Sequence, residues 1–498
     1  MHRVYLDWNI VTSLHQDREV TSKLKKMLFD SNYDILTPFS WSHVQDINKV
    51  SSNKEANCDG EWEFLDQLSK CNYMEYDYSK DITYPYIARA KEVHDKFHWG
   101  LNIHNHNIDS LLNALSGVTN EAVSNLVKLL LLLIPAPKLP QVPYRSSRMP
   151  SMYIETMDKL HNSSTLYHFM KHALDTNATI WGNPSKYHDY RLEVQSYLGI
   201  KPAMLSNQED PVNLIDEMLQ ASDPAGVFKG LDDVFNKNNS NTALKSTMIK
   251  FTSYYLMLDM TGFHSDKMSV KNSPTNTMTD AMHSYYAAYC DYLITLDRKM
   301  AFKSKAMYDK FGIETNVCTP DEFVEEVQTN HVNYNIMADL LQEVLHNFRD
   351  ESCFIAEIIN HDFLDKQILL FKPHKRIFDY FNFQYIILGS NDRLTFNLRH
   401  VGKNLSKFIT YSEATIIVNK FHRLLGADLY NRVLYTPQVD NEDLLNIQRY
   451  WVYEGFYIVL SFDELENSIQ ITIDLVNEQF VQELENELGF SERINTSD

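Results

Sequence analysis

Short apolar strands alternate with helices in two separate stretches of this 498-residue sequence. In the first stretch, VYL at residues 4–6 precedes a helical pattern, and a second strand near 33–37 precedes the helix WSHVQDINKV. A further helix near 60–69 leads to a strand near 73–76. This order is typical of a parallel sheet flanked by helices, so the sequence predicts an α/β fold.

The alternation resumes after a long interval. The segment TDAMHSYYAAYCDYLITLDRKM predicts a helix from about Met278 and a buried strand over 292–295, and a helix, the strand ETNVCT and the helix TPDEFVEEV follow. A chain of this length is expected to divide into domains. We predict three parts: an α/β core over 1–80 plus 275–330, a large α-helical insertion over 81–274, and an α+β C-terminal domain over 331–498. The alternating segments FYIVLSF and IQITIDL supply two strands of the last part.

Several classes of protein are excluded by what the sequence lacks. The start MHRVYLDWNI has no signal-peptide core, and the apolar run LLLLLI at 129–134 is far shorter than the roughly 20 residues of a membrane span. We interpret that run as a buried helix ended by Pro135. Neither a Gly-rich nucleotide-binding loop nor a GxSxG motif occurs, and the five cysteines form no CxxC pair. A cytoplasmic protein with no membrane contact is expected.

Acidic side chains stand where the predicted strands end. Asp7 follows the first strand, Asp46 lies on the helix after the second, Asp280 opens the helix before the strand 292–295, and Asp297 follows that strand. Sites in open α/β sheets form beyond the carboxyl ends of the strands, so these acids are expected to converge. Converging carboxylates repel one another unless a cation lies among them, and Mg²⁺ or Mn²⁺ prefers oxygen ligands. A metal held this way activates water for attack on a phosphodiester.

Other polar residues accompany these acids. His43 and His283 each lie three residues from an acid on the same helix face, where they are candidates for proton transfer or for a phosphate contact. Asn9 and Thr295 are candidates to orient a ligand or water. Asp291 is a weaker candidate for the same role, because an acid at the start of a strand is more often structural. Helix capping is the competing interpretation of the acids at 7, 280 and 297.

These segments together resemble a PIN-like nuclease domain. The resemblance rests on VYLDWN, on FSWSHVQDI, and on TDAMHSYYAAYCDYLITLDRKM with TPDEF behind it, and it covers about residues 1–80 plus 275–330. It implies a parallel sheet and an acidic metal site that cuts RNA, or sometimes structured DNA, with Asp7, Asp46, Asp280 and Asp297 as the metal ligands. The sequence departs from the family at Asp46, where Glu is usual, in its two histidines, and in the large insertion.

The resemblance implies a Mg²⁺- or Mn²⁺-dependent endoribonuclease, of the kind found among bacterial toxins and anti-phage defence effectors. The alternatives are a non-catalytic PIN-like binding or scaffold protein and a nuclease acting on single-stranded or flap DNA. The acids retained at all four positions favour an enzyme. For the C-terminal domain, a regulatory protein partner and a contact between copies of the chain are both left open.

Some further patterns have two interpretations each. The residues Arg298, Lys299, Lys303, Lys305 and Lys310 are expected either to contact phosphates or to form a solvated helix face. The tyrosines of SYYAAYCDY are expected in the core rather than stacked on bases. The segment HDKFHWGLNIHNHN is interpreted as a helix end followed by a turn, with a zinc site as the alternative.

The net charge of −20 argues at first against binding nucleic acid. Its distribution changes that conclusion, because residues 441–498 contain 13 acids and 2 bases. We therefore predict that this acidic end opposes RNA binding or contacts a basic partner, and that deleting 441–498 raises the affinity for nucleic acid.

Overall fold

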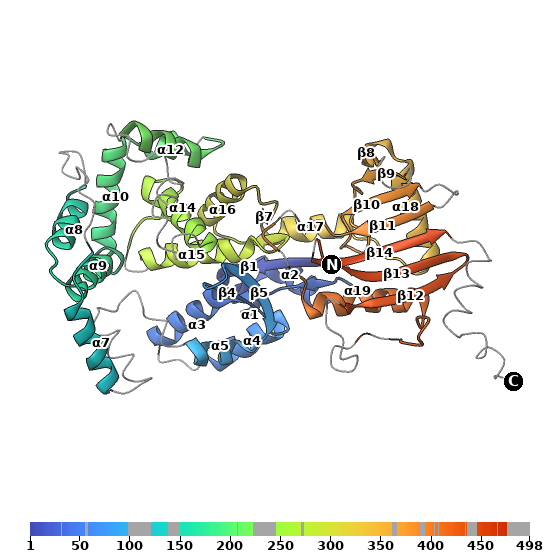
Figure 1. Ribbon diagram of the computed structural model, residues 1–498, viewed down its shortest axis with the longest axis horizontal. Helices are drawn as coiled ribbons and strands as arrows, with labels where there is room; N and C mark the ends of the chain where they lie inside the picture. Colours follow the sequence, from blue (N-terminus) through green and yellow to red (C-terminus); the bar gives the residue numbers. More distant parts are fainter. Residues whose placement is uncertain are drawn as a thin grey trace. The chain divides into compact units, whose positions relative to one another are not determined.

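In the computed structural model, the chain divides into two compact units. One unit comprises Tyr5–Arg18 and Pro38–Thr319, and the other comprises Met1–Val4, Glu19–Thr37 and Pro320–Asp498. Elements are labelled as in Figure 1. The structure describes residues 1–30, 32–54, 58–97, 121–137, 150–206, 208–222, 246–269, 273–360, 366–388, 394–402, 404–406, 408–433, 435, 446–465 and 467–475.

The acidic residues lie at the end of a four-stranded sheet with the order β2-β1-β6-β7. Its strands are β1 (His2–Leu6), β2 (Ile35–Leu36), β6 (Tyr292–Ile294) and β7 (Asn316–Cys318). β1 is buried along its whole length, which accounts for the apolar and aromatic run VYL over 4–6, and its first two residues, His2 and Arg3, are buried as well. β1 pairs with β2 in parallel, as does β6 with β7, so the predicted α/β class with parallel strand pairs is confirmed.

A second sheet of three strands lies in the same region of the sequence. It contains β3 (Phe39–Ser40), β4 (Asn72–Asp77) and β5 (Ile82–Ile87). β3 and β4 are parallel, whereas β5 returns antiparallel to β4. The sequence predicted the strand near 73–76 but not β5, which lies at the start of the segment expected to be helical.

Helices surround these strands. They are α1 (Trp8–His15), α3 (Trp41–Lys54), α4 (Asp59–Ser69), α14 (Thr247–Thr261), α15 (Pro274–Ala287) and α16 (Arg298–Phe311). α15 begins four residues earlier than expected, at a proline, which is favoured in the first turn because its missing N–H costs no helical bond there. Tyr285, Tyr286 and Tyr289 are buried, which confirms that the tyrosine-rich segment is core.

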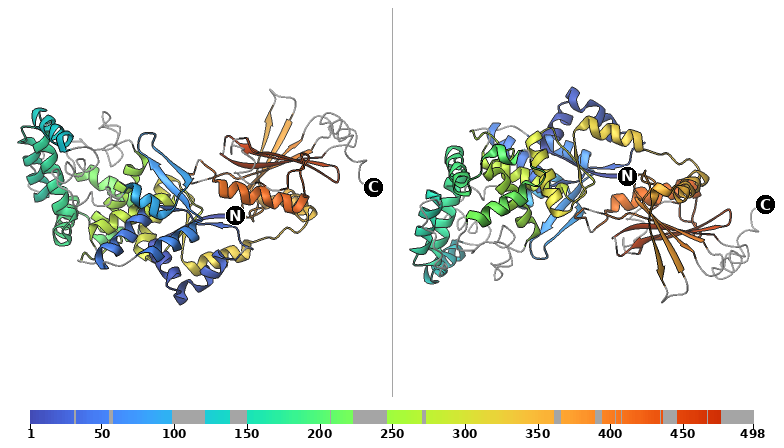
Figure 2. Two further views of the ribbon diagram at one scale, coloured as in Figure 1. Left: turned by 90° about the horizontal axis from the view of Figure 1, so that it is seen from below. Right: turned by 90° about the horizontal axis from the view of Figure 1, so that it is seen from above.

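The segment between the two sheet-forming stretches is mainly helical where it is described. Its helices are α5 (Ala90–Phe97), α7 (Glu121–Leu133), α8 (Ser151–His161), α9 (Leu166–Trp181), α10 (Pro184–Leu198), α11 (Pro202–Leu205) and α12 (Pro211–Ser222), and α14 closes the series. α7, α8 and α10 all pack on α9 (Figures 1 and 2). Side chains of Thr165, Asn183 and Ser246 cap α9, α10 and α14 and so fix where these helices begin.

The leucine run of α7 was predicted as a buried helix, and that prediction is wrong for its burial. The helix forms and ends before Pro135, but Leu133 is 70% exposed and Leu129 53% exposed. Only one face of α7 packs on α9, so a run of six consecutive apolar residues must place some of them outside that contact. Among the described residues, no helix is both long enough and apolar enough to cross a membrane.

The other unit is built on a seven-stranded antiparallel sheet with the order β12-β13-β14-β11-β10-β9-β8. Its strands are β8 (Phe354–Asn360), β9 (Lys366–Phe371), β10 (Phe383–Leu388), β11 (Leu394–Arg399), β12 (Gln448–Tyr453), β13 (Phe456–Asp463) and β14 (Ser468–Leu475). β13 and β14 confirm the two strands predicted from their alternating pattern. The helices of this unit are α2 (Ser22–Leu28), α17 (Pro320–Asn330), α18 (Met337–Arg349) and α19 (Tyr411–Leu425).

One buried face of this sheet forms the core of the unit. Ile417 and Phe421 of α19 and Leu340 of α18 belong to the same apolar cluster as Ile458 and Ile471 of the sheet. Figure 2 shows α19, in orange, against the sheet. Within the same unit, the Arg3 guanidinium donates to the Glu413 carboxylate at 2.7 Å, and both side chains are nearly inaccessible to solvent.

Part of the acidic end predicted over 441–498 belongs to the folded sheet of this unit. Residues 446–475 contain β12, β13 and β14, and β14 lies between β13 and β11 in the sheet. Deleting 441–498 would therefore remove three strands and their core residues, so the deletion first predicted would unfold this unit. The remainder of the acidic end, 476–498, lies outside the described residues.

Candidate metal centre

The carboxyl ends of β1 and β6 are joined by backbone and side-chain hydrogen bonds. The Asp7 N–H donates to the Ile294 carbonyl at 3.0 Å. The Thr295 hydroxyl donates to Asp7 Oδ2 at 2.7 Å and accepts the Asp297 N–H at 3.0 Å. The Asn9 amide donates to the same Asp7 oxygen at 2.5 Å. Thr295 and Asn9 thus orient the Asp7 carboxylate.

Asp7 occupies the N-cap position of α1 but does not cap it with its side chain. The capping interpretation therefore does not account for this carboxylate. Its residue is only 5% exposed, and burial raises the pKa of the carboxyl. The His283 ring and the Thr295 hydroxyl oppose this shift. Asp7 is a buried acid whose Oδ1 accepts no hydrogen bond from the described residues.

Asp280 lies inside α15 rather than at its start, so it is not a helix cap. Its partly buried carboxylate accepts no hydrogen bond from any described residue. Burial raises the pKa of this carboxyl well above its ordinary value, and the Lys303 ammonium opposes the shift. The negative charges of Asp7, Asp297 and Asp46 raise the pKa further. The four predicted acids therefore lie close enough to act on one another, and Asp280 is the least neutralised of them.

Asp46, on α3, differs from Asp280 because each of its carboxylate oxygens accepts a hydrogen bond. Oδ1 accepts from the Lys49 ammonium at 2.9 Å, and Oδ2 accepts from His283 Nε2 at 2.8 Å. Burial disfavours its charge, but Lys49 and His283 outweigh burial and hold the pKa of Asp46 below its ordinary value. Lys49 also donates to Thr279, beside Asp280, at 2.8 Å. The sequence analysis did not identify Lys49, although its position three residues after Asp46 on a helix was a usable signal.

A chain of hydrogen bonds fixes the His283 ring. Because a carboxylate only accepts, Nε2–H of His283 donates to Asp46 at 2.8 Å, and Nδ1 forms a hydrogen bond of 2.8 Å with the Tyr5 hydroxyl. Tyr5 in turn contacts the Ser40 hydroxyl at 2.6 Å. Ser40, Tyr5 and His283 are all buried, so this chain positions Asp46 from the interior.

His43 lies behind this chain and not at the acids. Its Nδ1 accepts the Ser40 N–H at 3.2 Å, and its Nε2 donates to the Leu6 carbonyl at 2.8 Å. Burial, reinforced by His283, lowers its pKa to about 3, so the ring is neutral. With both nitrogens engaged and 1% of the residue exposed, His43 supports the end of β1 and does not face a phosphate.

The last two acids predicted for the site, Asp291 and Asp297, stand on either side of β6 in the sequence. Asp297 caps α16, since its Oδ1 accepts the N–H groups of Lys299 at 2.8 Å and Met300 at 3.0 Å. Its Oδ2 accepts no hydrogen bond from the described residues, so capping leaves one oxygen for another ligand. Asp291 precedes β6, at the end opposite Thr295, and the structure does not bring it to the other acids.

The basic residues after Asp297 do not form one solvated face. Lys303 is fully buried, with its ammonium 3.3 Å from Asp259 Oδ1, and Lys299 donates to Asp266 at 3.0 Å. Lys310 lies 3.6 Å from Asp216. Arg298 and Lys305 are exposed. Both earlier interpretations are therefore wrong for Lys303, which forms a buried ion pair with α14.

The helical segment contributes residues to this region that the sequence analysis missed. Asp259 is fully buried on α14 and also accepts from the Tyr187 hydroxyl at 3.1 Å. Tyr255, on the same helix, is buried with no hydrogen-bond partner for its hydroxyl among the described residues. Burial and then Asp280 and Asp297 raise its pKa well above the ordinary value. An acid within the otherwise apolar run SYYLMLDMT was the available signal for this cluster.

The donor set fits a hard divalent cation. Asp7, Asp280 and Asp297 each leave oxygen without a hydrogen bond from the described residues, and oxygen is the donor that Mg²⁺ and Mn²⁺ prefer. No three ligand atoms of these acids lie within 4.8 Å of one another, since within the described ranges only Asp350, Cys353 and His374 of the other unit do so.

The histidine-rich segment is only partly described. His94 lies on α5, where it packs against Trp62 with ring centroids 5.3 Å apart and contacts the adjacent Asp95. His98, His104 and His106 lie outside the described residues.

Protein-family models, curated proteins and solved structures were all compared with this chain, and none matches it.

Proposed function

We propose that this protein is a metal-dependent endoribonuclease of PIN-like type. The observation that carries the proposal is the pair of acids Asp7 and Asp280. Burial and neighbouring carboxylates raise the pKa of both, and neither is paired with a cation in a direct contact. Such an arrangement is unfavourable for the fold by itself and is typical of a site for a divalent cation.

The arrangement of the strands also supports the PIN-like assignment. Asp7 follows β1 and Asp297 follows β6, and the two strands are neighbours in a sheet that contains parallel pairs. Sites at this edge of a parallel sheet are the general rule for α/β proteins. In this proposal, residues 81–274 are an insertion into the nuclease core that restricts access of the substrate, in a toxin or an anti-phage defence effector.

Asp7, Asp280 and Asp297 would hold the Mg²⁺ or Mn²⁺ ion. When bound, the ion supplies an activated water and stabilises the charge that develops on the phosphodiester. Asp46 remains ionised because Lys49 and His283 pair with it, and it thereby fixes the Lys49 ammonium at the edge of the site. The side chain of Lys49 is 37% exposed, so its ammonium can contact a substrate phosphate.

His283 positions Asp46 and does not face solvent. Its residue is 1% exposed, and its two ring nitrogens contact Tyr5 and Asp46. Its role in the proposed reaction is therefore to hold Asp46 and to keep a proton at Nε2. This role differs from a direct phosphate contact, one of the two roles expected from the sequence.

The test is a set of cleavage assays with the full chain. Labelled tRNA, unstructured RNA, single-stranded DNA and flap DNA are each incubated with Mg²⁺ or Mn²⁺. Cleavage of RNA is expected, and Asp280→Asn is expected to reduce it at least about 100-fold, because a ligand of the metal is lost. Asp309→Asn, which removes an exposed carboxylate from α16, is the matched control.

The outcomes separate the competing functions. Cleavage of DNA alone would assign the site to a DNA nuclease, because the metal chemistry is the same. Cleavage of no substrate with either metal would leave the non-catalytic interpretation. Equal cleavage by Asp280→Asn and the unaltered chain would reject the proposed metal site.

A further inference from the structure

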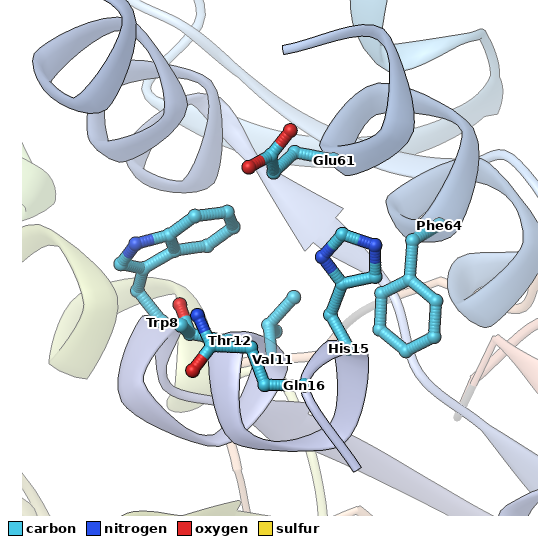
Figure 3. A pocket seen from close by; sticks show the side chains of 7 residues that line it. All are labelled: Trp8, Val11, Thr12, His15, Gln16, Glu61 and Phe64. Carbon is cyan, nitrogen blue, oxygen red and sulfur yellow. The ribbon is translucent and has the colours of Figure 1, made fainter. Parts of the chain in front are cut away.

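A pocket of about 170 Å³ opens between α1 and α4, in the same unit as the acids. Its walls include Trp8, Val11 and His15 of α1, Gln16 directly after that helix, and Glu61 and Phe64 of α4. Figure 3 shows the Trp8 indole and the His15 imidazole on opposite sides of the pocket, with the Glu61 carboxylate over it. The volume is below the roughly 300–1,000 Å³ of sites for larger ligands and suits a single planar ring system.

The two aromatic walls differ in how they are held. The His15 ring stacks on Phe64, with centroids 4.9 Å apart and an interplanar angle of 29°, so its orientation is fixed from behind. The Trp8 indole makes neither a hydrogen bond nor a ring contact with any described residue, although it is only partly exposed. Flat aromatic walls of this kind are what unstacked nucleobases bind.

The polar groups of the pocket provide one acceptor and one donor. The Glu61 carboxylate forms no hydrogen bond or ion pair within the described part of the chain, so it is an acceptor without a donor. An acid in the first turn of α4 is favourable for that helix, but this does not require the carboxylate to lie over the pocket. The Gln16 carbonyl accepts from Arg18 at 3.0 Å and 2.6 Å, which leaves the Gln16 NH₂ group to donate.

This combination distinguishes among the four bases. Guanine presents two adjacent N–H donors on its Watson–Crick edge, which match a carboxylate, next to a carbonyl acceptor, which matches an amide donor. Adenine and cytosine each place a ring nitrogen lone pair where it would face the carboxylate, and uracil has a single N–H between two carbonyls. A carboxylate therefore attracts guanine and disfavours the other bases.

The pocket is adjacent to the acids along the chain. Trp8 directly follows Asp7, and α1 begins between them. We propose that this pocket binds a guanine base of the substrate, stacked between Trp8 and His15 with its Watson–Crick edge on Glu61. This inference rests on the proposed nuclease function, because it makes the pocket the base-selective subsite of that same site.

The test measures binding without cleavage. The full chain with Asp280→Asn is titrated, in Mg²⁺, against fluorescein-labelled ten-nucleotide uridine RNAs that carry one central G, A, C or U. Fluorescence anisotropy is expected to show about tenfold tighter binding of the RNA with G than of that with A, as for a two-bond base contact. Adding Glu61→Gln is expected to reduce this preference to within about twofold.

Two further variants complete the design. Glu63→Gln removes the same charge from an exposed position of α4 and is expected to keep the full preference for G. Trp8→Ala is expected to weaken binding of the RNA with G, because the base loses its stacking surface. Circular dichroism of each variant confirms that the fold is retained.

The possible failures of the two proposals are distinguishable. A preference for G that depends on Glu61, in a protein that cleaves no nucleic acid, would support the pocket and reject the nuclease. Cleavage of RNA with no preference for G, or with a preference that Glu61→Gln leaves intact, would overturn the pocket. An absence of binding to all four RNAs would overturn it as well.

Discussion

Replacing Asp280 with asparagine is expected to stabilise the metal-free protein. The carboxylate accepts no hydrogen bond from described residues, so the substitution breaks none there. It removes the cost of burying a negative charge, which is the largest cause of the raised pKa, and the repulsion from Asp7, Asp297 and Asp46, at the loss of the attraction to Lys303. A partly exposed charge is screened by solvent, so the net gain is expected to be about 1–2 kcal/mol. For a unit of this size, that gain corresponds to a rise in Tm of about 2–3 °C.

The dependence on pH has a defined sign. Burial raises the pKa of Asp280 in the folded protein, so the folded state binds a proton more tightly than the unfolded chain. The stability from this proton is fully present below the ordinary carboxyl pKa of about 4 and is lost as the pH rises through the raised value. Asp7 contributes with the same sign. The advantage of Asp280→Asn over the unaltered chain is therefore expected to be small near pH 4 and to grow toward neutral pH.

Metal is expected to reverse the ranking. At about 100 times its dissociation constant, a bound ion stabilises the folded chain by about 2.7 kcal/mol, and Asp280→Asn would lose most of this. Thermal unfolding is followed by circular dichroism at pH 4, 5.5 and 7, with EDTA or with Mn²⁺, and Asp309→Asn is the control. A lower Tm for Asp280→Asn in EDTA at pH 7, or an equal rise with Mn²⁺ in both proteins, would refute this account.

Two other predictions follow from the structure. Lys303→Met is expected to lower the free energy of unfolding by about 3–5 kcal/mol, because it removes a cation that compensates the fully buried charge of Asp259. The control Lys305→Met, at an exposed position, should change that free energy by less than about 0.5 kcal/mol. Denaturant titration measures both, and equal effects would contradict the burial argument. Ending the chain after Leu475 removes six acids and one base but no described strand. The shortened protein is therefore expected to keep its Tm and to bind RNA more tightly at low salt. An RNA affinity that is unchanged at low salt, measured by fluorescence anisotropy, would reject a role of the acidic end in opposing RNA binding.

The local pattern of residues predicted most of the elements near the site. Apolar runs such as VYL and DYLI are followed by polar groups, and each became a buried strand ending at the acids. The alternation in FYIVLSF likewise predicted β13, because side chains of a half-buried strand face solvent and core in turn. Such patterns predict which face of an element is buried. They can be recognised from the sequence because they involve only residues that are close together along the chain.

Only the tertiary structure determines which strand or helix packs against each buried face. The neighbouring places of β1 and β6 in the sheet bring Thr295 to Asp7, and no local pattern specifies that pairing. The leucines of α7 were expected to be buried, but the helix that packs on them covers only part of the run. The acid-rich segment 446–475 was taken for part of an acidic end because composition does not reveal that its strands pair with β11.

The charged residues near the site show most clearly what the sequence determines and what the tertiary structure determines. The sequence by itself determined which acids gather at the strand ends. Only the tertiary structure decided that Asp46 is paired with Lys49 and His283, that Lys303 is buried against Asp259, and that Asp7 and Asp280 have no such partner. The physical reason is that the energy of a carboxylate depends on its burial and on the charges within a few ångströms, and those neighbours come from distant parts of the chain.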